Sequence, residues 1–190
     1  EIIKNINVEI PTGKLVVITG PNGGGKTSLA KLIAGLEKPT SGSIILDGED
    51  ITSLDITERA NKGISYAFQQ PVRFKGITVR DLLELAAGKK IEEKEICSLL
   101  GKVGLCTRDY IDREVNSSLS GGEIKRIEIA TVLARNTKLT IFDEPEAGID
   151  LWSFNELIDA FVEIKENYAG TLLIISHQER ILNIADEIIV

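Results

Sequence analysis

The sequence predicts an α/β fold in which a mostly parallel sheet is covered by helices on both faces. Strand-like apolar runs alternate with helix-like amphipathic segments, which is the pattern that parallel sheets with crossover helices produce. One of these runs, residues 15–18, leads through a glycine-rich loop directly into a helix-like segment. The chain has 190 residues, of which 43% are hydrophobic, enough for one domain with a sizeable core.

Composition excludes several classes of function. The formal net charge is -7, with 22 basic and 29 acidic residues, so we expect no nucleic-acid partner. No apolar run approaches the roughly 20 residues that span a bilayer, and no secretory signal is recognisable, so we expect that the chain is not itself a membrane protein. Sparse cysteine usage fits a reducing cytosol, so we expect a cytoplasmic protein. The two cysteines, Cys97 and Cys106, are too few for a disulfide framework or a metal cage. We expect both to be buried or half-buried thiols.

The N-terminal half is predicted to hold strands and short helices. Residues 2–10 alternate apolar and polar side chains, which predicts a half-buried strand. Residues 43–46, followed by an Asp-Gly turn, predict an antiparallel strand pair. A short helix is expected at residues 57–61, and residues 64–68 are a predicted strand that ends at Gln69.

The C-terminal half returns to alternating strands and helices after a different segment. Residues 70–118 contain helix-like patterns and no convincing core strand, which predicts a helical insertion. Two apolar runs, residues 139–142, which end in Asp143 and Glu144, and residues 171–175, predict buried strands. Helices are expected from Ser120, after residue 150 and after His177. Ligands of such a sheet collect beyond the carboxyl ends of its strands.

The glycine-rich segment at residues 20–27, called the phosphate loop below, has the pattern G-x-x-x-x-G-K-[ST] between a strand and a helix. Its glycines let backbone N–H groups approach an anion, and the following helix adds unpaired donors. Lys26 supplies a positive charge for the outer phosphates, and the Thr27 hydroxyl is a hard ligand for Mg²⁺. A glycine-rich turn that only caps a helix is the alternative. The predicted ATP-binding residues are Gly20, Pro21, Asn22, Gly23, Gly24, Gly25, Lys26, Thr27 and Ser28.

Polar residues at three other strand ends complete the predicted site. Asp143 is placed to bind Mg²⁺, and Glu144 can orient or deprotonate the water that attacks the γ-phosphate. Gln69 can contact Mg²⁺ or that water, and His177 can bond the γ-phosphate. The alternatives are a helix cap for the two acids and structural roles for Gln69 and His177.

A second candidate anion site, residues 119–123, is called the serine-glycine loop below. Ser120 can cap the following helix, and Gly121 and Gly122 leave the helix N-terminus open to an anion. One nucleotide cannot easily use two separated cradles of one chain. We therefore expect an ATP-dependent homodimer, in which this loop closes on the γ-phosphate held by the other chain.

Together these motifs resemble the nucleotide-binding domain of the ABC ATPase superfamily over nearly the whole chain. Residues 20–27 match its Walker A loop, residues 119–123 its signature, and residues 139–143 its Walker B strand. The resemblance implies an ATPase that uses ATP and Mg²⁺. It also implies a single domain over residues 1–190, incomplete at its N-terminus, with residues 70–118 as the helical subdomain.

The same resemblance assigns roles to single residues. It makes Gln69 the Q-loop glutamine, Glu144 the catalytic glutamate and His177 the switch histidine. Residues 147–150 resemble the D-loop, which adds Asp150 to the predicted nucleotide-binding set. The residue that stacks on adenine in this family lies in a strand before residue 1, so no residue here is given that role.

Four stretches resemble one branch of the superfamily, the SufC family and its short SmsC form, ATPases of iron–sulfur cluster assembly. They are residues 68–71 together with 76–79, residues 123–129, residues 145–154 and residues 176–182. This resemblance implies a soluble SufB-like scaffold as partner. The alternative is the ATP-binding subunit of a membrane transporter, whose partner is a transmembrane permease. A third hypothesis, a soluble ABC protein acting on nucleic acid or ribosomes, is disfavoured by the negative charge.

Three further patterns give weaker expectations. Lys125 and Arg126 are expected to lie on a solvated helix face. Trp152 and Phe154 are expected in the core. In ABC ATPases the partner docks between the core and the helical insertion, which implies a docking site at Phe74, Lys75, Gly76 and Ile77.

Overall fold

The computed structural model describes residues 3–68 and 74–190. Its centre is a five-stranded sheet in which every neighbouring pair of strands is parallel. The spatial order is β4-β5-β6-β1-β7. The bounds are β1 Leu15–Ile18, β4 Ile64–Ala67, β5 Leu139–Asp143, β6 Thr171–Ile175 and β7 Glu187–Ile189. Parallel strands place all their carboxyl ends at one edge, so residues that follow β1, β4, β5 and β6 gather there.

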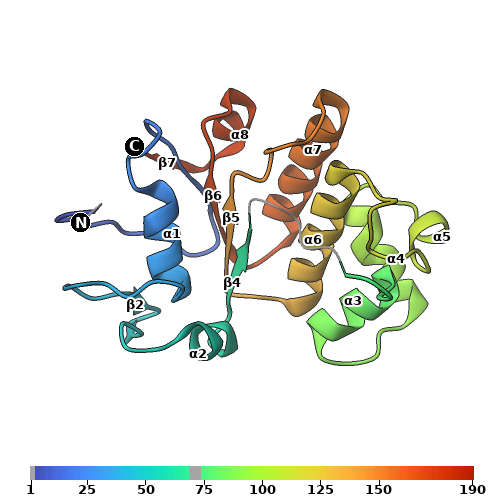
Figure 1. Ribbon diagram of the computed structural model, residues 1–190, viewed down its shortest axis with the longest axis horizontal. Helices are drawn as coiled ribbons and strands as arrows, with labels where there is room; N and C mark the ends of the chain where they lie inside the picture. The colour runs from blue at the N-terminus through green and yellow to red at the C-terminus, as the bar shows by residue number, and fades with distance from the viewer. Residues whose placement is uncertain (1–2, 69–73) are drawn as a thin grey trace.

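Helices cover both faces of this sheet (Figure 1). On one side lie α1 (Lys26–Ala34) and α2 (Ile56–Asn61), beside the short antiparallel pair β2 (Ile45–Leu46) and β3 (Glu49–Asp50). The helices of the other side include all those after β4. They are α3 (Val79–Ala87), α4 (Glu93–Lys102), α5 (Thr107–Tyr110), α6 (Gly121–Arg135), α7 (Leu151–Asn167) and α8 (Glu179–Ile184).

The alternation of side chains along a strand produces two apolar clusters. In β1, Val16 and Ile18 pack with Ala30 and other residues on the α1 side. Leu15 and Val17 point the other way, into a larger cluster with α6 and α7. All four side chains are buried, because a parallel sheet is covered on both faces. The predicted α/β class is therefore confirmed.

Arg59 holds α1, and with it the phosphate loop, against α2. The residue is 1% exposed. Its Nη1 atom donates to the carbonyl oxygen of Ile33 at 2.9 Å, and its Nε atom to that of Leu54 at 3.0 Å. A guanidinium at the last turn of α1 satisfies carbonyl groups that the helix itself leaves unpaired.

Two expectations are wrong. Residues 3–10 form no strand, and Ile6 and Val8 are 53% and 40% exposed. Alternation of side chains creates an apolar face, but a strand also needs a neighbour for its backbone hydrogen bonds, and none pairs with this segment among the described residues. Cys97 and Cys106 are both exposed rather than buried.

Residues 74–118 contain α3, α4 and α5, and their only sheet-like feature among the described residues is an isolated bridge between Thr78 and Glu114. Leu83 of α3 and Ile96 of α4 are fully buried in the same cluster as residues of α6 and β1. The helical character was anticipated. That residues 70–118 act as a subdomain stays a prediction.

Candidate functional site

The phosphate loop is held open by three glycines with positive φ. Gly20, Gly23 and Gly25 have φ angles of 135°, 82° and 91°, which side chains with a Cβ rarely adopt. Added Cβ atoms at Gly20 and Gly23 would meet nothing within 4 Å, so space lies beside the backbone at both positions. Pro21, Asn22 and the two glycines after them are exposed.

The loop runs into the N-terminus of α1 without a side-chain cap. Gly25 is the N-cap residue and makes no side-chain hydrogen bond. The first turn of α1 therefore keeps N–H donors and the positive end of the helix dipole for an anion. Lys26 Nζ donates to the carbonyl oxygens of Gly20 at 2.8 Å and Pro21 at 2.9 Å. Its ammonium group thus lies inside the curve of the loop.

Asp143 and Thr27 approach each other at the end of β5. Thr27 Oγ1 donates to Asp143 Oδ1 at 3.2 Å, and Asp143 is 5% exposed. A hydroxyl and a carboxylate are hard oxygen donors that suit Mg²⁺, which takes few protein ligands and completes its shell with phosphates and water. The described residues contain no cluster of three or more His, Cys, Asp or Glu side chains that could hold a metal.

Tyr66, which we did not single out from the sequence, also bonds Asp143. Its hydroxyl donates to Asp143 Oδ2 at 2.8 Å. Burial, with the nearby Asp143 carboxylate, raises the pKa of Tyr66 well above its usual value, so the group stays a hydroxyl donor. The register could have indicated this contact, because Tyr66 pairs with Ile141, two residues before Asp143 on the same face of β5.

Glu144 follows Asp143 with a strained backbone. Its φ angle is 44°, in the left-handed region that non-glycine residues rarely occupy. The N–H of Glu144 donates to the carbonyl oxygen of Ile175 at 2.9 Å, which ties the end of β5 to the end of β6. Non-glycine residues in such conformations cluster at functional sites, because the surrounding structure must hold them there.

His177 lies exposed after β6, next to the buried Ser176, whose side chain bonds the half-buried Glu146. Ser176 is 0% exposed, and its Oγ atom donates to Glu146 Oε1 and accepts the N–H of Gln178. Burial raises the pKa of Glu146 above its usual value, although the Ser176 bond offsets part of the shift. The sequence motifs gave no signal for this contact between Glu146 and Ser176.

The serine-glycine loop opens α6 with a complete capping box. Ser120 Oγ accepts the N–H of Glu123 at 3.1 Å, and Glu123 Oε2 accepts the N–H of Ser120 at 2.6 Å. The hydroxyl of Tyr110 donates to the other oxygen of Glu123. Burial acts to raise the pKa of Glu123, but the bonds from Tyr110 and Ser120 hold it below its usual value. The cap predicted for Ser120 is therefore present.

The glycines of this loop are packed rather than open. A Cβ added to Gly122 would lie 2.2 Å from Ser153 Cβ on α7. A Cβ on Gly121 would contact Ile149 and the carbonyl oxygen of Gly148, in the segment that follows β5. Asp150, from the same segment, caps α7 by accepting the N–H groups of Trp152 and Ser153, both at 3.0 Å. Its predicted contact with nucleotide stays a prediction.

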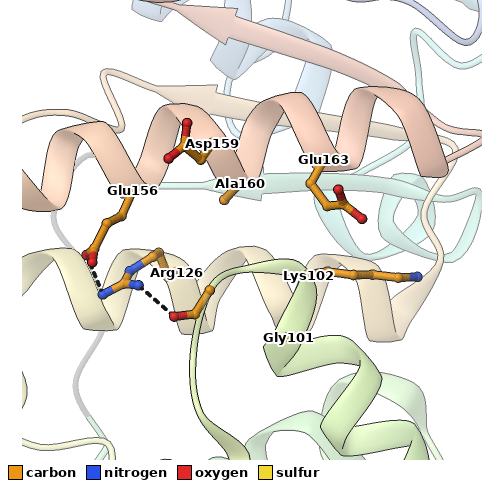
Figure 2. A pocket seen from close by; sticks show the side chains of 8 residues that line it. Gly101, Lys102, Arg126, Glu156, Asp159, Ala160 and Glu163 are labelled. Carbon is orange, nitrogen blue, oxygen red and sulfur yellow. Dashed lines mark hydrogen bonds and ion pairs between the residues drawn. The ribbon is translucent and has the colours of Figure 1, made fainter.

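Lys125 and Arg126 do not lie on a solvated face, so that expectation is wrong. They are 2% and 5% exposed. Lys125 Nζ donates to the carbonyl oxygen of Phe68 and to Glu128 Oε2, while Arg126 bonds Glu156 of α7 at 2.8 Å. Figure 2 shows Arg126 reaching from α6 to Glu156 beside a cavity of about 280 Å³. Both cations lie between packed elements, where backbone carbonyls and carboxylates compensate their burial.

The two aromatic residues predicted in the core of the helix after Asp150, Trp152 and Phe154, differ in burial. Phe154 is 9% exposed and belongs to the core, as expected, but Trp152 is 81% exposed and the expectation for it is wrong. Their offset of two residues puts them on different faces of α7.

Phe74 is half-buried against the larger cluster, whereas Lys75 and Gly76 are exposed. Gln69 lies outside the described residues, so its predicted role is not addressed by the structure.

Fold and site together define an α/β nucleotide-binding protein with a phosphate loop after β1 and an acidic pair, Asp143 and Glu144, at the end of β5. The sequence matches the ABC transporter family over residues 3–147, and the chain belongs to that family. It is an ABC ATPase domain, and it shares with that class the binding and hydrolysis of ATP.

Individual relatives and solved structures agree with this assignment. An uncharacterized ABC transporter ATP-binding protein of Methanocaldococcus jannaschii is 41% identical over 99% of this chain and 78% of its own. A sulfate/thiosulfate import ATP-binding protein, CysA of Synechocystis sp., is 35% identical, but the chain covers 53% of its length. A dimeric ATP-binding cassette in a post-hydrolysis state, bound to ADP and Pi, has a TM-score of 0.81 at 25% identity. That likeness covers 98% of this chain and 84% of the other.

Among the described residues, no helix combines the length and the apolar character needed to cross a membrane.

Proposed function

We propose that this chain is the ATP-hydrolysing subunit of a two-chain assembly, in which each ATP lies between the phosphate loop of one chain and the serine-glycine loop of the other. One observation carries the proposal. The phosphate loop opens α1, which packs on one face of the sheet, and the serine-glycine loop opens α6, which packs on the opposite face. Two anion-binding helix ends that are separated by a sheet cannot enclose the same triphosphate.

The residues divide the work as follows. ATP with Mg²⁺ binds at residues 20–28, and Thr27 and Asp143 hold the metal together with Gln69. The serine-glycine loop of the second chain, through Ser120, Gly121 and Gly122, contacts the γ-phosphate, and Asp150 lines the same junction. Glu144 and His177 then promote attack by water. The reaction needs positioning and charge stabilisation more than covalent chemistry.

Mixing two inactive variants tests the shared site. Lys26→Ala disables the phosphate loop, and Ser120→Arg blocks the serine-glycine loop, so each variant alone is expected to lose turnover. In a mixed dimer, one site combines the intact phosphate loop of one chain with the intact serine-glycine loop of the other. The mixture is expected to recover part of the wild-type ATPase rate. A mixture as inactive as its components would contradict the shared site.

A membrane transporter is the better supported setting. The relatives described above are named as transporter ATP-binding proteins, including one for sulfate/thiosulfate import. On this proposal the partner is a transmembrane permease, and the chain works at the cytoplasmic side of the membrane. The docking surface is proposed at residues 74–77. Phe74→Ala is expected to weaken co-purification with the partner while ATP binding persists, and equal loss of both would count against this placement.

Iron–sulfur cluster assembly is the second candidate. It is favoured by the stretches around residues 68–79, 123–129, 145–154 and 176–182, which resemble the SufC family. On that proposal the partner is a soluble SufB-like scaffold. Affinity capture of the chain separates the two settings, because a permease would require detergent for its recovery and a scaffold would not.

A further inference from the structure

The carboxylate of Asp143 is held by two different elements. Its Oδ1 atom accepts the Thr27 hydroxyl from α1, at 3.2 Å, and its Oδ2 atom accepts the Tyr66 hydroxyl from β4, at 2.8 Å. The torsion that turns an aspartate carboxylate is intrinsically soft, with broad minima. The direction in which Oδ1 points is therefore set by the hydrogen bonds of the group and not by its own geometry.

The sheet places Tyr66 for this contact. Parallel pairing puts Tyr66 opposite Ile141, and Asp143 is the next residue of β5 on the same face. Such a diagonal neighbour is within reach of a long aromatic side chain. The tyrosine ring packs edge-on against Phe68 at a centroid distance of 5.0 Å and lies against the apolar cluster beneath α1. The ring is therefore fixed, and its hydroxyl has a defined position.

We propose that Tyr66 is a positioning residue for Mg²⁺: its hydroxyl fixes the rotation of the Asp143 carboxylate so that Oδ1 faces Thr27 and the metal. The inference rests on the proposed function, because it concerns the same site. Tyr66 touches neither nucleotide nor metal on this account. It acts through the ligand, as outer-sphere partners of metal sites do.

The proposal predicts different effects of the Tyr66 hydroxyl on Mg²⁺ binding and on metal-free ATP binding. Lys26, the glycine backbone and the α1 N-terminus bind phosphate without Asp143, so removing the Tyr66 hydroxyl leaves metal-free ATP binding intact. The Mg²⁺ requirement rises, because a carboxylate that keeps only the bond from Thr27 is less well oriented and must be ordered when the ion binds. Loss of an outer-sphere partner typically weakens metal affinity by about 10- to 100-fold.

The test uses Tyr66→Phe, which keeps the ring and removes only the hydroxyl. The matched control is Tyr168→Phe. The Tyr168 hydroxyl bonds Thr137, two residues before the start of β5, so the control loses the same kind of group at the opposite end of that strand from Asp143. Binding of a fluorescent ATP analogue is measured in EDTA and across a Mg²⁺ titration, and thermal unfolding reports the stability of each variant.

The Mg²⁺ concentration that gives half of the Mg²⁺-dependent increase in ATP affinity is expected to be at least about tenfold higher for Tyr66→Phe than for the wild type. The Kd of Tyr66→Phe for ATP in EDTA is expected to be unchanged. Tyr168→Phe is expected to follow the wild type in both conditions. A wild-type Mg²⁺ requirement in Tyr66→Phe, or an equal loss of affinity with and without Mg²⁺, would overturn the inference alone. Absence of any Mg²⁺ effect on the wild-type protein would overturn the proposed function as well.

Discussion

The phosphate loop and the serine-glycine loop both place glycines at a helix N-terminus, but for opposite physical reasons. Gly20 and Gly23 have positive φ angles and open space beside them, so they are glycines because of the backbone conformation. Gly121 and Gly122 have ordinary φ angles, and Gly122 is a glycine because Ser153 occupies the space of a side chain. The first loop therefore needs glycine for its backbone conformation, and the second needs it for packing against the rest of the protein.

The N-termini of the two helices differ in the same sense. The helix after the phosphate loop has no side-chain cap, whereas Ser120 and Glu123 cap the helix after the serine-glycine loop. A cap already supplies one acceptor to the helix donors. On the proposed function, this difference means that the first loop binds triphosphate by itself and that the second adds a rigid surface to an ATP already bound.

The largest expected effect comes from Glu144→Gln, which keeps the shape of the side chain and removes the proposed general base. Turnover is expected to fall by about 10²- to 10⁴-fold. Because both loops remain intact, ATP is expected to hold two chains together, which sedimentation in excess ATP can measure. A variant that stays monomeric there would break the comparison, since the loops would then not meet on one nucleotide.

Gly122→Ala should have the next largest effect. The new Cβ overlaps Ser153, and overpacking of this kind costs about 1–3 kcal/mol. The free energy of unfolding, measured with denaturant, and the ATPase rate are both expected to fall, while ATP binding to the monomer persists. The double variant Gly122→Ala, Ser153→Gly removes the opposing Cβ and is expected to recover part of the lost stability. Failure of this rescue would show that Gly122 is not a packing glycine.

Gly23→Ala tests the other loop and has a smaller expected cost. Alanine in a left-handed conformation is strained by about 1–2 kcal/mol. Gly88→Ala is the matched control, because Gly88 also has a positive φ and open space but lies at the end of α3. Both variants are expected to lose similar stability, and only Gly23→Ala to weaken ATP binding. Equal ATP affinities would mean that the phosphate loop is not the anion site.

The smallest expected effect concerns Glu146, in the segment behind the serine-glycine loop. Its pKa in the folded protein is raised above the ordinary value of 4.5, chiefly by burial, so folding favours the neutral acid. Its ionisation therefore costs stability as the pH rises through the folded pKa, and the cost vanishes below the unfolded pKa. Glu146→Gln cannot ionise. Its unfolding free energy relative to wild type is expected to increase between pH 4 and pH 8, and a constant difference would contradict this.

Local sequence patterns predicted what depends on near neighbours. The phosphate loop, the cap at Ser120 and the acidic strand end at Asp143 each follow from a few adjacent residues, and the structure contains all three elements. The strand order β4-β5-β6-β1-β7 could not be predicted, because it depends on pairings between segments far apart in the chain. The false strand at residues 2–10 has the same origin, since a pattern of side chains does not specify a partner.

The errors in burial have a related cause. In the sequence, Lys125 and Arg126 look like a solvated pair, yet both side chains are buried. Lys125 bonds the carbonyl oxygen of Phe68, and Arg126 bonds the carboxylate of Glu156. Those partners lie 57 and 30 residues away. The prediction for Trp152 is wrong in the opposite direction, since the residue was expected in the core and is exposed. The hydrophobicity of a single residue does not tell which side of α7 meets the core. Tyr66 was missed although the register contained the signal, since the register itself was unknown.

The left-handed backbone at Glu144 makes the most stable residue at this position different from the one that the proposed hydrolysis requires. Asparagine or glycine tolerates a φ of 44° far better than glutamate, so either would relax the end of β5 by about 1–3 kcal/mol and remove the carboxylate of the proposed general base. Directed evolution of this protein for heat resistance alone would therefore enrich well-folded variants that no longer turn over ATP, unless each round also screens for hydrolysis.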